Sequence, residues 1–189
     1  MRPRFTLTVV SSADGYIARH PGDAPRDWAS PEEQALFLAD VEAADWGVMG
    51  RGTHEAAERP DRRRIVFSAS GGAGSWRRPS QLWVDPAGLA PADLAALVDP
   101  VRPLSRGLVL GGTRVHDWFL AHRAIDRVHL TVEPLRFGGG LPIFTGRAGG
   151  DPLEVFAAAG FGPVSERALN GAGTRFAVLE PGAPRPQDG

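Results

Sequence analysis

The chain has 189 residues, of which 42% are hydrophobic and 23% are charged, and a formal net charge of −1. These values are typical of one ordinary globular domain, and they lack the basic surplus of a nucleic-acid-binding protein. Cysteine is absent, which excludes disulfides, cysteine-ligated zinc, iron–sulfur clusters and thiol catalysis. All 21 positively charged side chains are arginine, so Schiff-base lysines and phosphate-loop lysines are excluded as well.

No apolar stretch approaches the roughly 20 residues that span a bilayer, and Met1–Arg4 leads straight into a strand-like run without the apolar core of a signal peptide. The sequence therefore predicts a cytoplasmic protein with no membrane partner. The short basic cluster Arg62–Arg64 is expected to be a solvated edge before a strand rather than a nucleic-acid contact.

Apolar runs and turn signals predict alternating strands and helices. Ser30 is a helix cap, followed by proline at the first helical position and by two carboxylates, Glu32 and Glu33, which the helix dipole favours there. Further helices are predicted near residues 53–57, 91–97, 113–120 and 153–158. Strands are predicted at residues 5–10, 46–49, 64–67, 81–84, 108–110, 126–132, 163–169 and 174–179.

This order predicts the α/β class. Strands that alternate with helices through the first 130 residues imply a mostly parallel sheet covered on both faces, a three-layer α/β/α arrangement. The turn Asn170-Gly171-Ala172-Gly173 is a hairpin signal, so a C-terminal antiparallel hairpin should make the sheet mixed. We expect one domain at residues 1–180 and a flexible tail at 181–189.

Two strand–glycine–helix segments could bind an anionic ligand, because such sheets bind ligands beyond the carboxyl ends of their strands. In the first, Gly50 permits a tight turn, Arg51 places a guanidinium at a helix start, and the Thr53 hydroxyl can cap that helix or bind a phosphate. In the second, Gly111 and Gly112 let a pyrophosphate approach the backbone. Together they favour a dinucleotide site, although no G-x-G-x-x-G fingerprint follows a strand.

These residues carry a family resemblance that covers roughly residues 4–180. Met49-Gly50-Arg51-x-Thr53-x-Glu55 and the later glycine pair resemble the two cofactor elements of dihydrofolate reductases. Ser12-Ala13-Asp14-Gly15-Tyr16-Ile17-Ala18 is similar to an element of a sister family, the reductase domain at the C-terminus of bacterial bifunctional riboflavin deaminase–reductases. Segments 27–31 and 125–144 extend the match. The resemblance implies a dihydrofolate-reductase-like fold, NADPH as cofactor, and a homodimer.

The resemblance also implies an oxidoreductase that transfers hydride to a pyrimidine- or pteridine-like small molecule. The best-known activity of the family is 5-amino-6-(5-phosphoribosylamino)uracil reduction in riboflavin biosynthesis. The resemblance also implies which residues bind the cofactor. The adenosine end and pyrophosphate would contact Gly50, Arg51 and Thr53, and the pyrophosphate would also contact Gly111, Gly112 and Thr113. The 2′-phosphate would contact Ser68, and the nicotinamide would lie by Trp28.

The substrate side of the cleft is assigned to Asp14, Ser30 and Glu133. Asp14 would bind the substrate or help deliver a proton after hydride transfer; the alternative is an Asx-turn before Gly15. Trp28 could instead only pack on the helix behind Ser30, and Glu133 could instead pair with Arg136. The glycine-rich stretch 71–75 is interpreted as a flexible loop that borders the adenine.

Two departures from the riboflavin-pathway pattern bear on the substrate. That pattern has a lysine where this chain has Thr8, and a glutamate where it has Leu110. An NADPH-binding dimeric module that has lost catalysis therefore remains an alternative. So does a dihydrofolate reductase proper, which needs a carboxylate on the first long helix, where Glu32, Glu33 and Asp40 are available. The five histidines lack metal-ligand spacing, so no metal site is expected.

Overall fold

The computed structural model of the protein describes residues 2–182. In chain order its elements are β1 (Arg4–Ser12), β2 (Tyr16–Ala18), η1 (Pro25–Asp27), α1 (Pro31–Ala43), β3 (Trp46–Gly50), α2 (Arg51–Ala56), β4 (Arg64–Phe67), η2 (Ala69–Gly71), β5 (Ser75–Arg78), β6 (Gln81–Val84), α3 (Pro91–Val98), β7 (Arg106–Gly111), α4 (Thr113–Ala121), β8 (Arg127–Glu133), β9 (Leu141–Pro142), α5 (Pro152–Ala158), β10 (Phe161–Ala168) and β11 (Arg175–Pro181).

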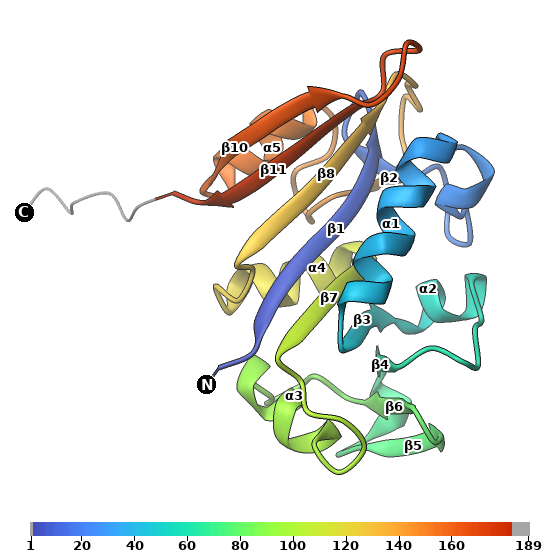
Figure 1. Ribbon diagram of the computed structural model, residues 1–189, viewed down its shortest axis with the longest axis vertical. Coiled ribbons are helices and arrows are strands. Elements are labelled where there is room, and N and C mark those ends of the chain that lie inside the picture. Colours follow the sequence, from blue (N-terminus) through green and yellow to red (C-terminus); the bar gives the residue numbers. More distant parts are fainter. Residues whose placement is uncertain (1, 183–189) are drawn as a thin grey trace, which may run out of the picture.

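Within these residues the strands form a nine-stranded sheet in the order β10-β11-β8-β1-β7-β3-β4-β6-β5, and β2 pairs with β9 in a separate two-stranded sheet (Figure 1). The neighbouring pairs from β8 to β6 are parallel. The edge strand β5 and the hairpin β10–β11 are antiparallel to their neighbours. The mixed, mostly parallel sheet and the C-terminal hairpin confirm the predicted fold class.

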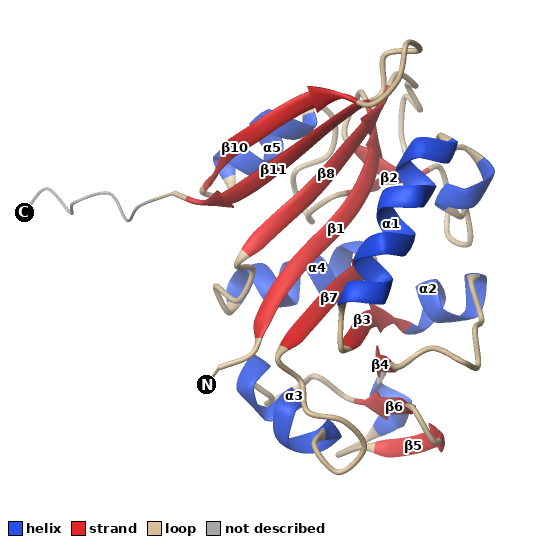
Figure 2. Cartoon of the chain, in the orientation of Figure 1, coloured by secondary structure: helices blue, strands red, loops and turns tan. Residues whose placement is uncertain are grey.

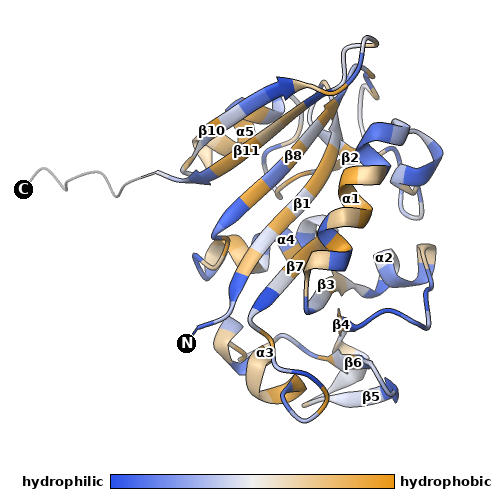
Figure 3. Ribbon diagram, viewed as in Figure 1, coloured by the Kyte–Doolittle hydropathy of each residue, from blue (hydrophilic) through white to orange (hydrophobic). Residues whose placement is uncertain are grey.

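Helices cover both faces of this sheet, as the three-layer prediction requires (Figure 2). On one face, α4 packs through Phe119, whose ring lies 4.8 Å from that of Phe5 and 6.2 Å from that of Phe67. The helices α3 and α5 add Leu94, Val98 and Phe156 to the same core cluster. Apolar residues are concentrated in the central strands, whereas the hairpin strand β10 is exposed along most of its length (Figure 3).

The opposite face is covered by α1 and has a more polar contact with the sheet. Ser30 caps this helix as predicted, since its hydroxyl accepts a hydrogen bond of 3.3 Å from the Glu33 amide. Glu33 is the fully buried residue of α1, and its apolar residues Leu36, Phe37 and Val41 are only half-buried. The helix therefore places a carboxyl group, rather than an aliphatic side chain, deepest against the sheet.

The structure corrects three sequence-based expectations. The second helix begins at Arg51, so Gly50 is its cap and Thr53 lies inside the helix, where its hydroxyl does not cap it. The stretch 71–75 is not wholly a loop, because β5 begins at Ser75 and pairs with β6. Arg64 is buried at 7% exposure, and is not part of a solvated edge.

The predicted tail at residues 181–189 lies mainly outside the described residues, and its first residue, Pro181, ends β11. None of the helices in residues 2–182 is both long enough and apolar enough to cross a membrane.

Candidate active site

The residues predicted to bind ligands follow strands that run parallel, so the strands end at one edge of the sheet. Asp14 follows β1, Ser68 follows β4, and Gly50, Gly111 and Glu133 are the last residues of β3, β7 and β8. The strands β3 and β7 are direct neighbours, with Met49 opposite Gly111. The two glycine turns therefore lie side by side at the carboxyl edge, where α/β sheets bind ligands.

A hydrogen bond connects the two glycine turns. The Gly112 amide donates to the Thr53 hydroxyl oxygen at 3.3 Å, although 59 residues separate them in the chain. Gly112 caps α4 and Gly50 caps α2, with no side-chain cap at either helix. Gly111 has a φ of +105°, a conformation that residues with a Cβ rarely adopt. Together these features hold the backbone at Gly50 and the backbone at Gly111–Gly112 in a fixed position relative to each other.

Replacing Thr53 by valine should loosen this arrangement. The substitution keeps the shape of the side chain and removes one hydrogen bond, worth about 0.5–1.5 kcal/mol, and it leaves the Gly112 amide without that partner. We expect the dissociation constant for NADPH, the cofactor that the sequence resemblance implies, to rise several-fold while the melting temperature changes little. Isothermal titration calorimetry checks the affinity; an unchanged affinity would mean that the bond between the turns does not support the site.

Two further residues assigned to the cofactor have their polar groups in defined positions. The Thr113 hydroxyl donates to the Pro142 carbonyl at 2.6 Å and so ties α4 to β9. The Arg51 side chain is 62% exposed and lies 3.8 Å from the Glu55 carboxylate. Arg51 is therefore a solvated guanidinium with a weak helical partner, accessible to an incoming anion.

His116 was missed by sequence reasoning, although it lies directly beneath the second glycine turn. Its Nδ1 donates to the Ile143 carbonyl at 2.9 Å, so Nε2 is the acceptor of a neutral ring, and burial lowers the pKa of this histidine. Nε2 is buried without a hydrogen-bond partner among the described residues, 3.2 Å from where a Cβ on Gly111 would lie. The signal that could have identified His116 was its position in the sequence, four residues after the glycine pair.

Asp14 holds a loop beyond the end of β1. Its carboxylate accepts hydrogen bonds from the Ser12 hydroxyl at 2.6 Å and from the amides of Phe137 and Gly138 at 3.1 and 2.8 Å. Burial alone would raise the pKa of Asp14, but these hydrogen bonds outweigh it and lower the pKa below its ordinary value. Asp14 is thus an ionised group at neutral pH, which suits positioning of the 137–138 loop better than proton donation.

Trp28 packs against the loop that Asp14 holds. The ring of Phe137 meets the Trp28 ring edge-on, with 5.1 Å between centroids. The Trp28 indole Nε1 is buried and has no hydrogen-bond partner among residues 2–182. Buried indole N–H groups usually find an acceptor, so this N–H is a candidate donor to a bound ligand.

Glu133 and Ser30 are joined to each other. Glu133 is 3% exposed; one carboxylate oxygen accepts from the Ser30 amide at 2.7 Å and the other from the Thr174 hydroxyl at 2.6 Å. The carboxylate therefore fastens the start of α1 and the hairpin turn to the end of β8. Glu133 does not pair with Arg136, since the hydrogen bonds and ion pairs of the described residues include no such contact.

Of the three carboxylates available on α1, Glu33 is the buried one, at 4% exposure. Burial, together with the nearby Glu133 and Asp40 carboxylates, raises the pKa of Glu33 to about 7. Glu32 lies outside and accepts a hydrogen bond from Asn170. A carboxyl group with a pKa near neutrality can both donate and accept a proton at pH 7.

Thr8 and Leu110, where the departures from the riboflavin-pathway pattern fall, lie on the sheet face that α1 covers. Thr6 is opposite Leu108, and alternation along the strands places Thr8 and Leu110 on that same face. The Thr8 hydroxyl donates to Asp40 at 2.7 Å, and His129 contacts the same carboxylate oxygen at 2.9 Å. At the position where the riboflavin-pathway pattern has a lysine, this chain thus has Thr8, whose hydroxyl is hydrogen-bonded to Asp40 of α1.

Ser68 lies at the end of β4 and caps η2. Its hydroxyl oxygen accepts from the Ser70 amide at 3.3 Å and lies 2.9 Å from the Ser70 hydroxyl. The half-buried Ser68 and the exposed Ser70 thus place two hydroxyls together at the edge of the sheet, two strands from Gly111 in the order β7-β3-β4. Ser70 was not singled out from the sequence.

Comparison with solved structures gives similar folds at low sequence identity. A protein assigned to riboflavin biosynthesis from Shewanella sp. PV-4 matches with a TM-score of 0.67 and 21% identity over 95% of this chain and 99% of that one. Dihydrofolate reductase from Enterococcus faecalis, solved with NADP(H), matches with a TM-score of 0.63 and 15% identity over 94% and 96%.

A bifunctional diaminohydroxyphosphoribosylaminopyrimidine deaminase/5-amino-6-(5-phosphoribosylamino)uracil reductase from Thermotoga maritima matches with a TM-score of 0.68 and 20% identity. The match covers 95% of this chain and 57% of that protein. No protein-family model matches the chain, and neither does any curated protein sequence.

The architecture and these neighbours define the class: the chain has the dihydrofolate-reductase-like fold. The two riboflavin-pathway proteins share this fold, in agreement with the resemblance of the sequence motifs.

Proposed function

We propose that the protein is an NADPH-dependent oxidoreductase that transfers hydride to a pyrimidine- or pteridine-like small molecule. The observation that carries this proposal is the Thr53–Gly112 hydrogen bond, which fixes two glycine turns side by side at the carboxyl edge of a dihydrofolate-reductase-like sheet. Two such turns suit the two ends of one long anionic ligand.

The residues at this edge fit a dinucleotide. Gly111 and Gly112 leave the backbone bare where a pyrophosphate would approach, and Arg51 offers an exposed guanidinium. The buried Trp28 Nε1 and His116 Nε2 have no hydrogen-bond partner within residues 2–182. NADPH, when bound, supplies the hydride. Gly50, Gly111, Gly112 and Thr113 would then hold the pyrophosphate, and Ser68 the 2′-phosphate.

On the substrate side, this chain's residues shape the cleft and hold a proton. Asp14 keeps Phe137 against Trp28, and Glu133 keeps the Ser30 end of α1 against the sheet. Asp14, Ser30 and Glu133 would therefore act on the substrate chiefly by holding the segments around it in place. Glu33, with a pKa of about 7, is the group suited to carry a proton at the substrate.

The proposal predicts selective binding of NADPH. Titration with NADPH should quench the tryptophan fluorescence and raise the melting temperature, since a ligand that binds only the folded state stabilises it by mass action. NADH should have the smaller effect in both measurements. The absence of any response to NADPH at millimolar concentration would rule out the proposed function.

Glu33 specifically favours a second candidate, dihydrofolate reductase proper, which was expected to need a carboxylate on the first long helix. Steady-state assays with dihydrofolate and with the phosphoribosylaminouracil substrate, each with NADPH, separate the two reductases. Binding of NADPH with no turnover of either substrate, or of simple carbonyls, would favour the third reading, a module that has lost catalysis. The homodimer stays a prediction.

A further inference from the structure

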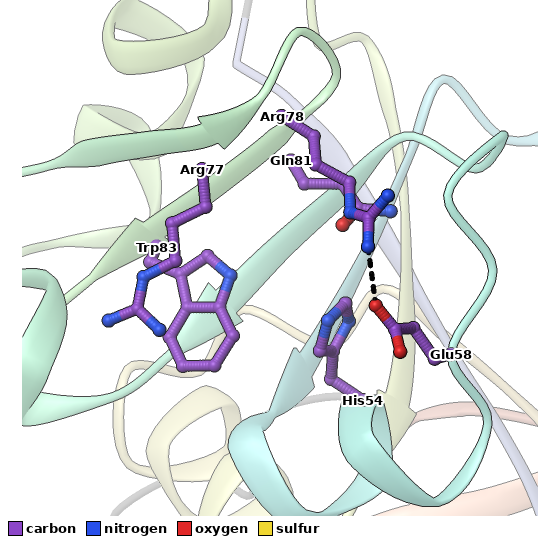
Figure 4. Close-up of a pocket in the computed structure, with 6 residues that line it drawn as sticks. All are labelled: His54, Glu58, Arg77, Arg78, Gln81 and Trp83. Atoms are coloured by element: carbon purple, nitrogen blue, oxygen red, sulfur yellow. Dashed lines mark hydrogen bonds and ion pairs between the residues drawn. The ribbon is translucent and has the colours of Figure 1, made fainter.

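The strand that the sequence did not reveal, β5, carries an arginine in an unusual setting. The guanidinium of Arg77 lies over the indole ring of Trp83, 3.6 Å from its centroid (Figure 4). Trp83 is 5% exposed and comes from the neighbouring strand β6. The buried ring is therefore a fixed platform, and stacking holds the guanidinium in one place.

Hydrogen bonds orient the same guanidinium toward the end of β4. One terminal nitrogen of Arg77 donates to the Ser70 hydroxyl at 2.9 Å, and that hydroxyl lies 2.9 Å from the Ser68 hydroxyl. The three polar groups form a continuous row from β5 to the end of β4. Ser70 is exposed and Ser68 is half-buried, so the row can be reached by a ligand.

The charge of Arg77 has no counter-ion in the part of the chain that the structure describes, where no carboxylate lies within 4.0 Å of it. The next residue differs: Arg78 donates to the Glu58 carboxylate at 2.6 Å, on the other side of the same pocket of about 320 Å³ (Figure 4). The charge of Arg78 is thus neutralised by Glu58, whereas the charge of the adjacent Arg77 has no such partner among the described residues.

A preoriented guanidinium with free N–H groups beside two hydroxyls matches the oxygen atoms of a phosphate monoester, because guanidinium groups bind such oxygens in pairs. We propose that Arg77, together with Ser68 and Ser70, binds the ribose 2′-phosphate and so determines the preference for NADPH over NADH. This inference rests on the proposed function. It assigns the cation of the subsite to β5, a strand outside both glycine segments.

The test compares dissociation constants for NADPH and NADH, measured by calorimetry on the full-length protein. In Arg77→Leu, NADPH should bind about 10- to 100-fold more weakly, as expected for losing hydrogen bonds to a charged group. The NADH affinity should be unchanged. Arg77→Lys, which keeps the charge without the planar fork, should lose less. The control Arg78→Leu, on the same strand, should leave the NADPH/NADH ratio unaltered.

A fragment assay locates the effect on the phosphate itself. Wild-type protein should bind 2′-AMP more tightly than 5′-AMP or inorganic phosphate, and Arg77→Leu should abolish that difference. If wild type prefers NADPH but Arg77→Leu retains the full preference, the role of Arg77 is overturned and the proposed function stands. If wild type binds neither nucleotide, the proposed function and this inference both fail.

Discussion

Replacing Glu33 by glutamine is expected to stabilise the protein at pH 8 and to leave its stability unchanged near pH 4. Burial and the neighbouring carboxylates raise the pKa of Glu33 from 4.5 to about 7 in the folded state. The folded state therefore binds the proton more tightly than the unfolded state, so stability falls as pH rises from about 4.5 to 7. Glutamine removes this penalty, which amounts to about 3 kcal/mol above pH 7.

Urea denaturation of both proteins from pH 4 to pH 8.5 measures the effect as the difference between their unfolding free energies. The matched control is Glu32→Gln, because Glu32 is the preceding residue on the same helix and is exposed. The Asn170 hydrogen bond lowers the pKa of Glu32, so Glu32→Gln should differ from wild type by a constant amount above pH 5, with no change between about pH 5 and pH 8.5. Parallel pH curves for wild type and Glu33→Gln would show that Glu33 titrates normally and would remove its support for a proton-carrying role.

The same variant should lose turnover while it keeps the cofactor. A positioned acid or base contributes about 10²–10⁴-fold to a proton-transfer step, so kcat should fall in that range. The NADPH affinity should remain within about twofold of wild type, since Glu33 lies on α1 and not at either glycine turn. A variant that gains stability and loses activity is the result expected when a group that serves function at the expense of stability is removed.

Replacing Gly71 by alanine is expected to destabilise the protein by about 3 kcal/mol or more, at the upper end for overpacking. A Cβ at this position would lie 2.3 Å from the Val84 amide nitrogen and 2.5 Å from the Trp83 carbonyl carbon. Both are backbone atoms of the strand β6, so no side-chain rotation relieves the clash. The backbone of η2 would have to move away from β6.

Thermal unfolding measures this loss, and Gly72→Ala is the control. A Cβ on Gly72 meets nothing within 4 Å, although its φ of +54° makes alanine somewhat strained. With a ψ of −140°, this position lies in backbone space that favours glycine, so Gly72→Ala should cost about 1–3 kcal/mol through strain alone, less than Gly71→Ala. Because η2 carries Ser70, Gly71→Ala should also weaken NADPH more than NADH. Equal stability of the two variants would mean that η2 does not pack on β6 as described.

The sequence by itself determined the order of the longer elements, the fold class and the two glycine turns, but not the short strands β2, β5 and β9. These features depend on local signals: β-branched runs, the Ser30–Pro31 helix start, and the Asn170-Gly171 turn all act through neighbouring residues. The motifs from Ser12 to Ala18 and from Met49 to Glu55 were specific enough to predict the dihydrofolate-reductase-like fold that the solved structures confirm.

Only the tertiary structure decided what the individual polar groups do. Glu32 and Glu33 are alike in sequence, yet one is exposed and the other lies buried near Glu133, because the helical period turns adjacent residues to different sides. Arg77 contacts Trp83 because β5 pairs with β6, and it contacts Ser70 because the chain between them turns back. Burial and long-range pairing set pKa and charge balance, and neither has a local sequence signal.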